Sequence, residues 1–202
     1  IDLHLSALGQ MGVEFTEKEG KLKAVADKLH GAHIRLPFPS VGATENIILA
    51  GVMADGDTVL EGAAMEPEIM ALCEYLLCCG ALIEGAGGGR LVIRGGRRLY
   101  GTDYAVPADR IVAGTYLFAC MGAGGSVLLE QAPEDEMSAV IQTARRMGGN
   151  VCVSPEGIYV QAPQRIKPVR LVTAPYPGFP TDLQSVVLAA ETLGCGCSHI
   201  EE

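Results

Sequence analysis

The sequence predicts a mixed α/β fold built from one repeated unit of helices and strands. Three glycines, Gly12, Gly80 and Gly148, each follow a helical pattern and precede an alternating run, and consecutive ones lie 68 residues apart. That period is longer than the roughly 20 to 50 residues of solenoid repeats. In addition, 49% of the residues are hydrophobic and 19% are charged, which provides ample apolar surface for a buried core. We therefore expect a globular α/β protein rather than a solenoid.

The chain is expected to open on a helix. Leu3, Leu5, Leu8 and Met11 supply its inward apolar residues, and Asp2 is a candidate N-cap. The glycine that follows suits the left-handed position after a helix, which residues with a Cβ adopt only with strain. The same argument applies to the other two repeated glycines, so each of the three marks a helix end.

The later elements repeat this pattern in step. Helices are expected at residues 71–79 and 137–147, and a second set at 44–54, at 113–123 and, more loosely, from Thr181. Short strands are expected at residues 21–25, 56–59, 90–93, 124–127 and 158–160. The repeated unit is thus helix, strand, helix and two strands. Residues 91–93 and 127–129 are too apolar for half-exposed strands, so helices should cover one face of their sheets.

Charge and cysteine usage limit the classes of function. A net charge of −9 disfavours a nucleic-acid-binding protein, which usually carries a basic stripe. The longest apolar run, residues 47–54, has 8 residues, well short of a membrane span, and no signal peptide is visible. The seven cysteines form an odd set without a framework spacing. We therefore expect reduced, mostly buried thiols in a cytoplasmic protein.

One proline-rich stretch, residues 175–184, reads P-Y-P-G-F-P-T-D-L-Q. Its prolines fix the backbone in an extended form that excludes helix. An apolar helical pattern follows from Leu183, so Thr181 and Asp182 stand where a helix begins. The Asp182 carboxylate is therefore either an N-cap or a catalytic or substrate-holding group, and its position alone leaves both interpretations open.

A second loop, residues 36–44, reads L-P-F-P-S-V-G-A-T. Its prolines stiffen the backbone, Gly42 lets a ligand approach the main chain, and Thr44 can start the helix that follows. Free N–H groups at a helix N-terminus form an anion site, but the loop lacks the G-x-x-x-x-G-K of a Walker motif. An anion site and a simple capped junction are equally compatible with the pattern.

The C-terminal residues Cys195, Cys197 and His199 raise the alternative of a metal site. If they lay on one strand, alternation would place all three on the same face. Their spacing is too tight for a structural zinc hairpin, and a fourth ligand is not evident.

The two loops and the opening I-D-L-H resemble the corresponding segments of the UDP-N-acetylglucosamine enolpyruvyl transferase family, and the resemblance extends over the whole chain. It implies an inside-out α/β prism, in which each of two domains holds three βαβαββ units with helices inside and sheets outside. This chain resembles about half of that architecture, as two incomplete domains. Residues 1–107 would be the C-terminal part of the domain with the nucleotide-sugar site and catalytic loop, and 108–202 the start of the returning second domain.

The resemblance also implies an activity. Members transfer the enolpyruvyl group of phosphoenolpyruvate to the 3-hydroxyl of UDP-N-acetylglucosamine in peptidoglycan synthesis, without a metal or organic cofactor. Asp182 would accept the proton of that hydroxyl. The implied partners are the two substrates and the missing remainder of the chain, with no nucleic acid and no membrane. The implied substrate-binding residues are Ile1, Asp2 and Leu3 for uracil, Phe38, Pro39, Ser40, Val41 and Gly42 for the diphosphate and uridine, and Thr181 beside Asp182.

Some positions depart from the family pattern. Phe38 stands where some members carry Lys, Met65 where Arg is usual, and Val112 where an acidic residue is usual. The family's reactive Cys loop lies before the segment that matches Ile1, so we expect these 202 residues alone not to catalyse. Two alternatives stay open: an enzyme like 5-enolpyruvylshikimate-3-phosphate synthase, whose substrate loops are richer in Arg and Lys, and a non-catalytic nucleotide-sugar-binding paralogue or fragment.

Overall fold

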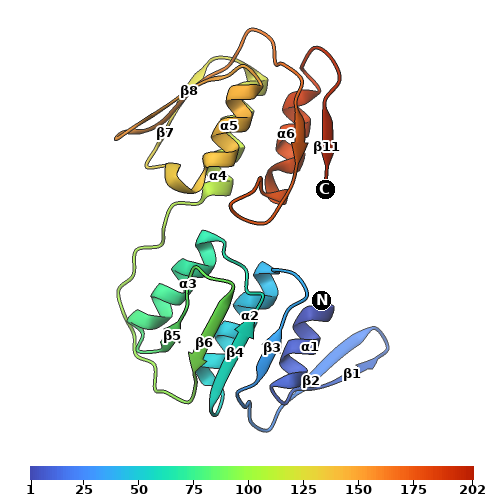
Figure 1. The fold of residues 1–202 in the computed structure, drawn as a ribbon, viewed down its shortest axis with the longest axis vertical. Helices are drawn as coiled ribbons and strands as arrows, with labels where there is room; N and C mark the ends of the chain where they lie inside the picture. Colours follow the sequence, from blue (N-terminus) through green and yellow to red (C-terminus); the bar gives the residue numbers. More distant parts are fainter. The chain divides into compact units, whose positions relative to one another are not determined.

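The computed structural model describes residues 1–202. They form two compact units, Ile1–Val106 and Pro107–Glu202 (Figure 1). The sequence analysis placed the division after residue 107, and the assignment of the two parts to different domains of a longer enzyme stays a prediction. None of the helices combines the length and the apolar composition that a membrane span requires.

The first unit contains one complete copy of the repeat. Its elements are α1 (Asp2–Gln10), β1 (Glu14–Lys18), β2 (Lys21–Val25), β3 (His33–Arg35), α2 (Val41–Met53), β4 (Asp57–Glu61), α3 (Pro67–Cys78), β5 (Leu82–Glu84) and β6 (Arg90–Arg94). From β3 to β6 the order is strand, helix, strand, helix, strand, strand. This is the βαβαββ unit that the resemblance implied, with one leading strand more than the period alone had indicated.

The strands of that repeat form a sheet in the order β3-β4-β6-β5. β3 runs parallel to β4, with His33 opposite Val59, and β6 runs antiparallel to both β4 and β5. A parallel neighbour requires a crossover connection, which α2 supplies. The hairpin of β1 and β2 forms a separate two-stranded sheet.

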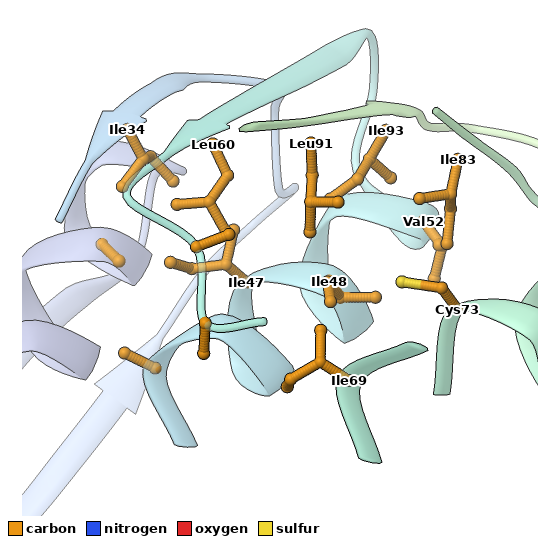
Figure 2. Packing of buried hydrophobic residues seen from close by; sticks show 14 of the residues in the cluster. Ile34, Ile47, Ile48, Val52, Leu60, Ile69, Cys73, Ile83, Leu91 and Ile93 are labelled. Atoms are coloured by element: carbon orange, nitrogen blue, oxygen red, sulfur yellow. The ribbon is translucent and has the colours of Figure 1, made fainter. Parts of the chain in front are cut away.

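Helices cover one face of the four-stranded sheet, as the sequence predicted. Along β4 and β6 buried residues alternate with less buried ones, which is the period of a sheet with one face in the core. Figure 2 shows the strand residues Leu60 and Leu91 facing Ile47 and Ile48 of α2. Because side chains from the sheet and helices interdigitate here, this layer fixes the position of α2.

The second unit repeats the pattern around a core of its own. Its elements are α4 (Arg110–Ala123), β7 (Ser126–Glu130), the 3₁₀ turn η1 (Glu134–Glu136), α5 (Ser138–Arg146), β8 (Asn150–Ser154), β9 (Gly157–Gln161), β10 (Arg170–Val172), the 3₁₀ turn η2 (Thr181–Leu183), α6 (Gln184–Glu191) and β11 (His199–Glu201). β7, β9 and β8 form an antiparallel sheet, and β10 pairs with β11 in parallel.

The three repeated glycines have nearly the same conformation. Gly12, Gly80 and Gly148 have φ angles of 97°, 96° and 97°. After each helix the second residue past the cap returns a hydrogen bond, as in the 3.0 Å bond from Val13 N–H to the Leu8 carbonyl. This is the Schellman arrangement that favours glycine. The predicted helix ends are therefore confirmed.

Candidate functional site

The loop before α2 is a capped helix start. Ser40 has extended backbone angles, and its Oγ accepts a 3.4 Å hydrogen bond from Ala43 N–H. The prediction that Thr44 starts this helix is wrong, because the helix begins one turn earlier at Val41. The N–H groups of Val41 and Gly42 have no intrahelical acceptor in such a first turn. They lie at the positive end of the helix dipole, which suits an anion.

Thr44 has a different role. Its side chain is buried, and its Oγ1 accepts a 3.0 Å hydrogen bond from Ala64 N–H. That bond links the first turn of α2 to the segment that enters α3. The loop with the predicted diphosphate contacts is thus anchored from within the unit.

The N-terminal residues lie beside this loop (Figure 1). Ile1 is the N-cap residue of α1 and Asp2 is its first helical residue, with no side-chain capping bond, so the prediction of Asp2 as the N-cap is wrong. α1 packs against α2. At Gly42 an added Cβ would lie 3.0 Å from Nε2 of His4. The structure therefore brings together two of the predicted groups, residues 1–3 and 38–42.

A hollow of about 450 Å³ adjoins the same loop, lined by Arg35, Leu36, Pro37, Glu61 and Gly62. Arg35 and Glu61 lie at the ends of the parallel strands β3 and β4, and Arg35 Nε is 3.9 Å from Glu61 Oε2. The sequence analysis missed Arg35. Its signal was a basic residue just before a loop in which Phe38 replaces the Lys of some family members, and Phe38 itself is 59% exposed.

The Asp182 loop shows that the capping interpretation of this carboxylate is wrong. Thr181, Asp182 and Leu183 form a 3₁₀ turn ahead of α6, and neither helix start carries a side-chain capping bond. Because Asp182 lies within the turn, Pro180 takes the N-cap position and its carbonyl accepts the Leu183 N–H at 3.1 Å. The Asp182 side chain is exposed. The carboxylate is therefore available for a ligand.

The backbone around Asp182 is nevertheless firmly packed. Leu183 is fully buried, and a Cβ added to Gly114 of α4 would lie 2.4 Å from its Cδ1. Phe179 packs against Phe118, with ring centroids 6.1 Å apart. An exposed carboxylate on such a supported turn has a defined position, which is what a group that acts on a substrate requires.

Arg110 provides a further support. It is buried at the start of α4, and its guanidinium carbon lies 5.6 Å from the centroid of the Tyr176 ring. This cation–π contact ties the proline-rich segment to α4.

Met65 and Val112 are the two positions where the sequence differs from the residues usual in the family it resembles. Their exposed fractions are 39% and 50%, respectively.

All seven cysteines are free thiols, but the expectation that most are buried is wrong. Cys78, Cys152, Cys195 and Cys197 are exposed because they lie at helix ends, on an outer strand face or in the C-terminal bends. In the core, burial raises the pKa of the Cys73 thiol to about 11, with a smaller effect from Glu74. A thiol with so high a pKa is a poor nucleophile at neutral pH.

The C-terminal Cys and His residues do not share a strand face. β11 begins only at His199, and the two cysteines lie in the bends before it. Nowhere among residues 1–202 do three or more His, Cys, Asp or Glu side chains gather closely enough to hold a metal ion.

Comparison with known proteins places this geometry in a family. A family model described as EPSP synthase (3-phosphoshikimate 1-carboxyvinyltransferase) matches residues 1–202. The chain belongs to the EPSP synthase family. Within this family, a UDP-N-acetylglucosamine 1-carboxyvinyltransferase of Sphingopyxis alaskensis is 47% identical over 204 residues, and that of Oleidesulfovibrio alaskensis is 43% identical over 202. Both alignments include the whole chain, but only 48% and 49% of the relatives.

The chain therefore spans about half the length of the curated relatives it matches. Two solved structures share its fold. The enolpyruvyl transferase NikO from Streptomyces tendae aligns over 98% of this chain and 50% of its own, with a TM-score of 0.80 and 21% identity. An EPSP synthase from Acinetobacter baumannii aligns with a TM-score of 0.61 and 21% identity, over 98% of this chain and 47% of its own. The predicted fold class is confirmed.

Proposed function

We propose that the protein containing this chain transfers the enolpyruvyl group of phosphoenolpyruvate to the 3-hydroxyl of UDP-N-acetylglucosamine, in the cytoplasm, as a step of peptidoglycan synthesis. The observation that carries the proposal is the 40 to 47% identity, over the full chain, to curated UDP-N-acetylglucosamine 1-carboxyvinyltransferases. In this proposal residues 1–107 and 108–202 belong to two domains of the longer enzyme.

The first unit supplies the nucleotide-sugar site. The start of α1 lies beside the start of α2, so Ile1, Asp2 and Leu3 can contact the uracil while the neighbouring loop holds the diphosphate. Val41 and Gly42 offer N–H groups at a helix N-terminus, the arrangement that binds phosphate. Because Phe38 is not basic, these amides and Ser40 carry the anion contact, and Arg35 adds a positive charge beside them.

Asp182 supplies the base, with Thr181 beside it. The hydroxyl oxygen of the sugar forms a bond to C2 of phosphoenolpyruvate, the hydroxyl proton passes to the Asp182 carboxylate, and the bond from C2 to the phosphate oxygen breaks to release phosphate. An exposed carboxylate on a packed turn supports this role, because it can accept a proton without leaving a helix end uncapped. Such a group typically contributes about 10² to 10⁴ in rate.

A second candidate, transfer to shikimate 3-phosphate, is favoured by one observation, the description of the matching family model. The loops here offer few cations for an acceptor that carries its own phosphate. Residues 36–44 and 175–184 contain no Lys or Arg. We therefore place this acceptor second.

Phosphate release tests the choice of acceptor directly. The full-length protein containing this chain is incubated with phosphoenolpyruvate and either UDP-N-acetylglucosamine or shikimate 3-phosphate. We expect phosphate release in the reaction that contains UDP-N-acetylglucosamine and none in the reaction that contains shikimate 3-phosphate. Release only with shikimate 3-phosphate would establish the second candidate. Binding of the nucleotide sugar without any release would indicate a non-catalytic paralogue.

A further inference from the structure

His4 lies between the two groups of predicted nucleotide-sugar contacts. It belongs to the first turns of α1, next to Leu3, and its ring faces Gly42 in the first turn of α2. A methyl group on Gly42 would lie 3.0 Å from His4 Nε2 and 3.6 Å from Cε1. The imidazole therefore leaves no spare room between the starts of the two helices.

Packing holds the imidazole ring of His4, because the nitrogen on its buried side makes no hydrogen bond. Nδ1 of His4 is buried without a hydrogen-bond partner. Leaving a buried polar atom unpaired opposes folding. Such exceptions in native proteins need an explanation, and departures from local rules concentrate at functional sites. An aliphatic side chain could fill the same space without that penalty, so packing energy alone does not account for the histidine.

We infer that His4 is a positioning residue for nucleotide-sugar binding. By resting against Gly42, its flat ring sets the separation between residues 1–3 and the anion-binding first turn of α2. Uracil and diphosphate are joined in one ligand, so their two contact regions must lie at a fixed distance. A rigid spacer there increases affinity, because less binding free energy is lost in ordering the site when the ligand binds. The inference rests on the proposed function.

A double-mutant cycle in the full-length protein tests it. Gly42→Ala places a methyl against the ring and should raise the KM for UDP-N-acetylglucosamine by about tenfold, which is ~1.4 kcal/mol. His4→Ala removes the spacer and should also raise KM. In the double variant the methyl meets no ring, so its KM should be lower than the product of the two single effects by more than a factor of about two, the usual limit of additivity. In all three variants kcat should change less than KM.

Two further variants distinguish spacing from other roles. Gly9→Ala is the matched control, because its added methyl meets no atom within 4 Å, and it should leave KM unchanged. His4→Asn keeps a polar nitrogen near the position of Nδ1 but cannot reach Gly42. It should behave like His4→Ala if the ring is a spacer. A KM for His4→Asn equal to that of the parent would overturn the inference, because a hydrogen bond from that nitrogen would then be the functional contact.

The remaining outcomes are also decisive. Single effects that multiply within a factor of about two in the double variant would overturn the inference. If Gly42→Ala fails to fold, His4→Ala decides alone, and a normal KM with a normal melting temperature would overturn it. A parent protein that does not bind UDP-N-acetylglucosamine would overturn the proposed function and this inference together. If the parent protein binds UDP-N-acetylglucosamine and the effects of the two substitutions on KM multiply, only the inference about His4 would be overturned.

Discussion

Two aspartates in the second unit stand at helix starts and have different surroundings. Asp109 is the N-cap of α4, and its Oδ1 accepts hydrogen bonds from Ile111 N–H at 2.7 Å and Val112 N–H at 3.0 Å. Asp182 lies within the 3₁₀ turn before α6, where no side-chain capping bond is made. Both residues are exposed, so the same residue type satisfies the backbone at one start and makes no capping bond at the other.

A capping residue is identified by its place relative to the first helical turn, and not by its residue type. Asp109 precedes its helix and has extended backbone angles, so its carboxylate reaches the free N–H groups. Asp182 is already inside a turn, and its carboxylate makes no capping hydrogen bond. We interpret Asp109 as structural and Asp182 as functional.

The largest expected effect comes from removing the charge of Asp182, the proposed base. In the full-length protein, Asp182→Asn should lower kcat by about 10² to 10⁴ because the amide cannot accept the hydroxyl proton. The KM for the nucleotide sugar should change far less. Steady-state kinetics measure both. Asp109→Asn is the matched control, since it keeps a capping oxygen, and its kcat should stay near that of the parent.

The next effect concerns the packing that supports Asp182. Gly114→Ala places a methyl 2.4 Å from Cδ1 of the buried Leu183, and such overpacking typically destabilises by about 1 to 3 kcal/mol. Because Leu183 is next to Asp182, kcat should fall as well. The control is Gly122→Ala in the same helix, where the nearest atom is an ordinary 3.5 Å contact with Leu193.

Thermal melts and kinetics of both glycine variants separate the two effects. Gly122→Ala should be neutral or slightly stabilising, because alanine favours a helix interior by up to about 1 kcal/mol. Equal melting temperatures and equal kcat values for the two variants would show that Leu183 does not constrain the turn.

A smaller effect is expected at the aromatic support. Tyr176→Leu removes the ring beneath the Arg110 guanidinium, a contact that is typically worth about 0.5 to 2 kcal/mol. Tyr176→Phe keeps the ring and should lose less stability. Denaturant unfolding of the two variants measures the difference. A Leu variant as stable as the Phe variant would show that the contact between Arg110 and Tyr176 does not stabilise the loop.

The sequence predicted the repeat because its period depends on local signals. Helix ends at Gly12, Gly80 and Gly148 follow from a backbone conformation that only glycine adopts cheaply. Apolar spacing likewise located the six α-helices and five of the eleven strands, including β2 at its observed bounds. These features need no knowledge of distant parts of the chain.

The predictions of which residues cap the helices were wrong because capping depends on backbone angles, which the sequence does not give. Ser40 and Thr44 are both hydroxyl residues in one loop, and only the backbone angles show that Ser40 is the cap. Asp182 failed as a cap because a 3₁₀ turn precedes α6. The contact between His4 and Gly42 joins residues that are distant in sequence, so no local pattern could reveal it.

The measurement that tests the contrast between the two aspartates most directly is a pair of thermal melts, of Asp109→Ala and Asp182→Ala, in the full-length protein. Loss of an N-cap typically costs about 1 kcal/mol, so Asp109→Ala should melt clearly below the parent. Asp182→Ala removes no capping bond and should stay within about 0.5 kcal/mol of the parent, as exposed substitutions usually do. If Asp182→Ala were destabilised as much as Asp109→Ala, Asp182 would be a structural residue and its assignment as the base would be contradicted.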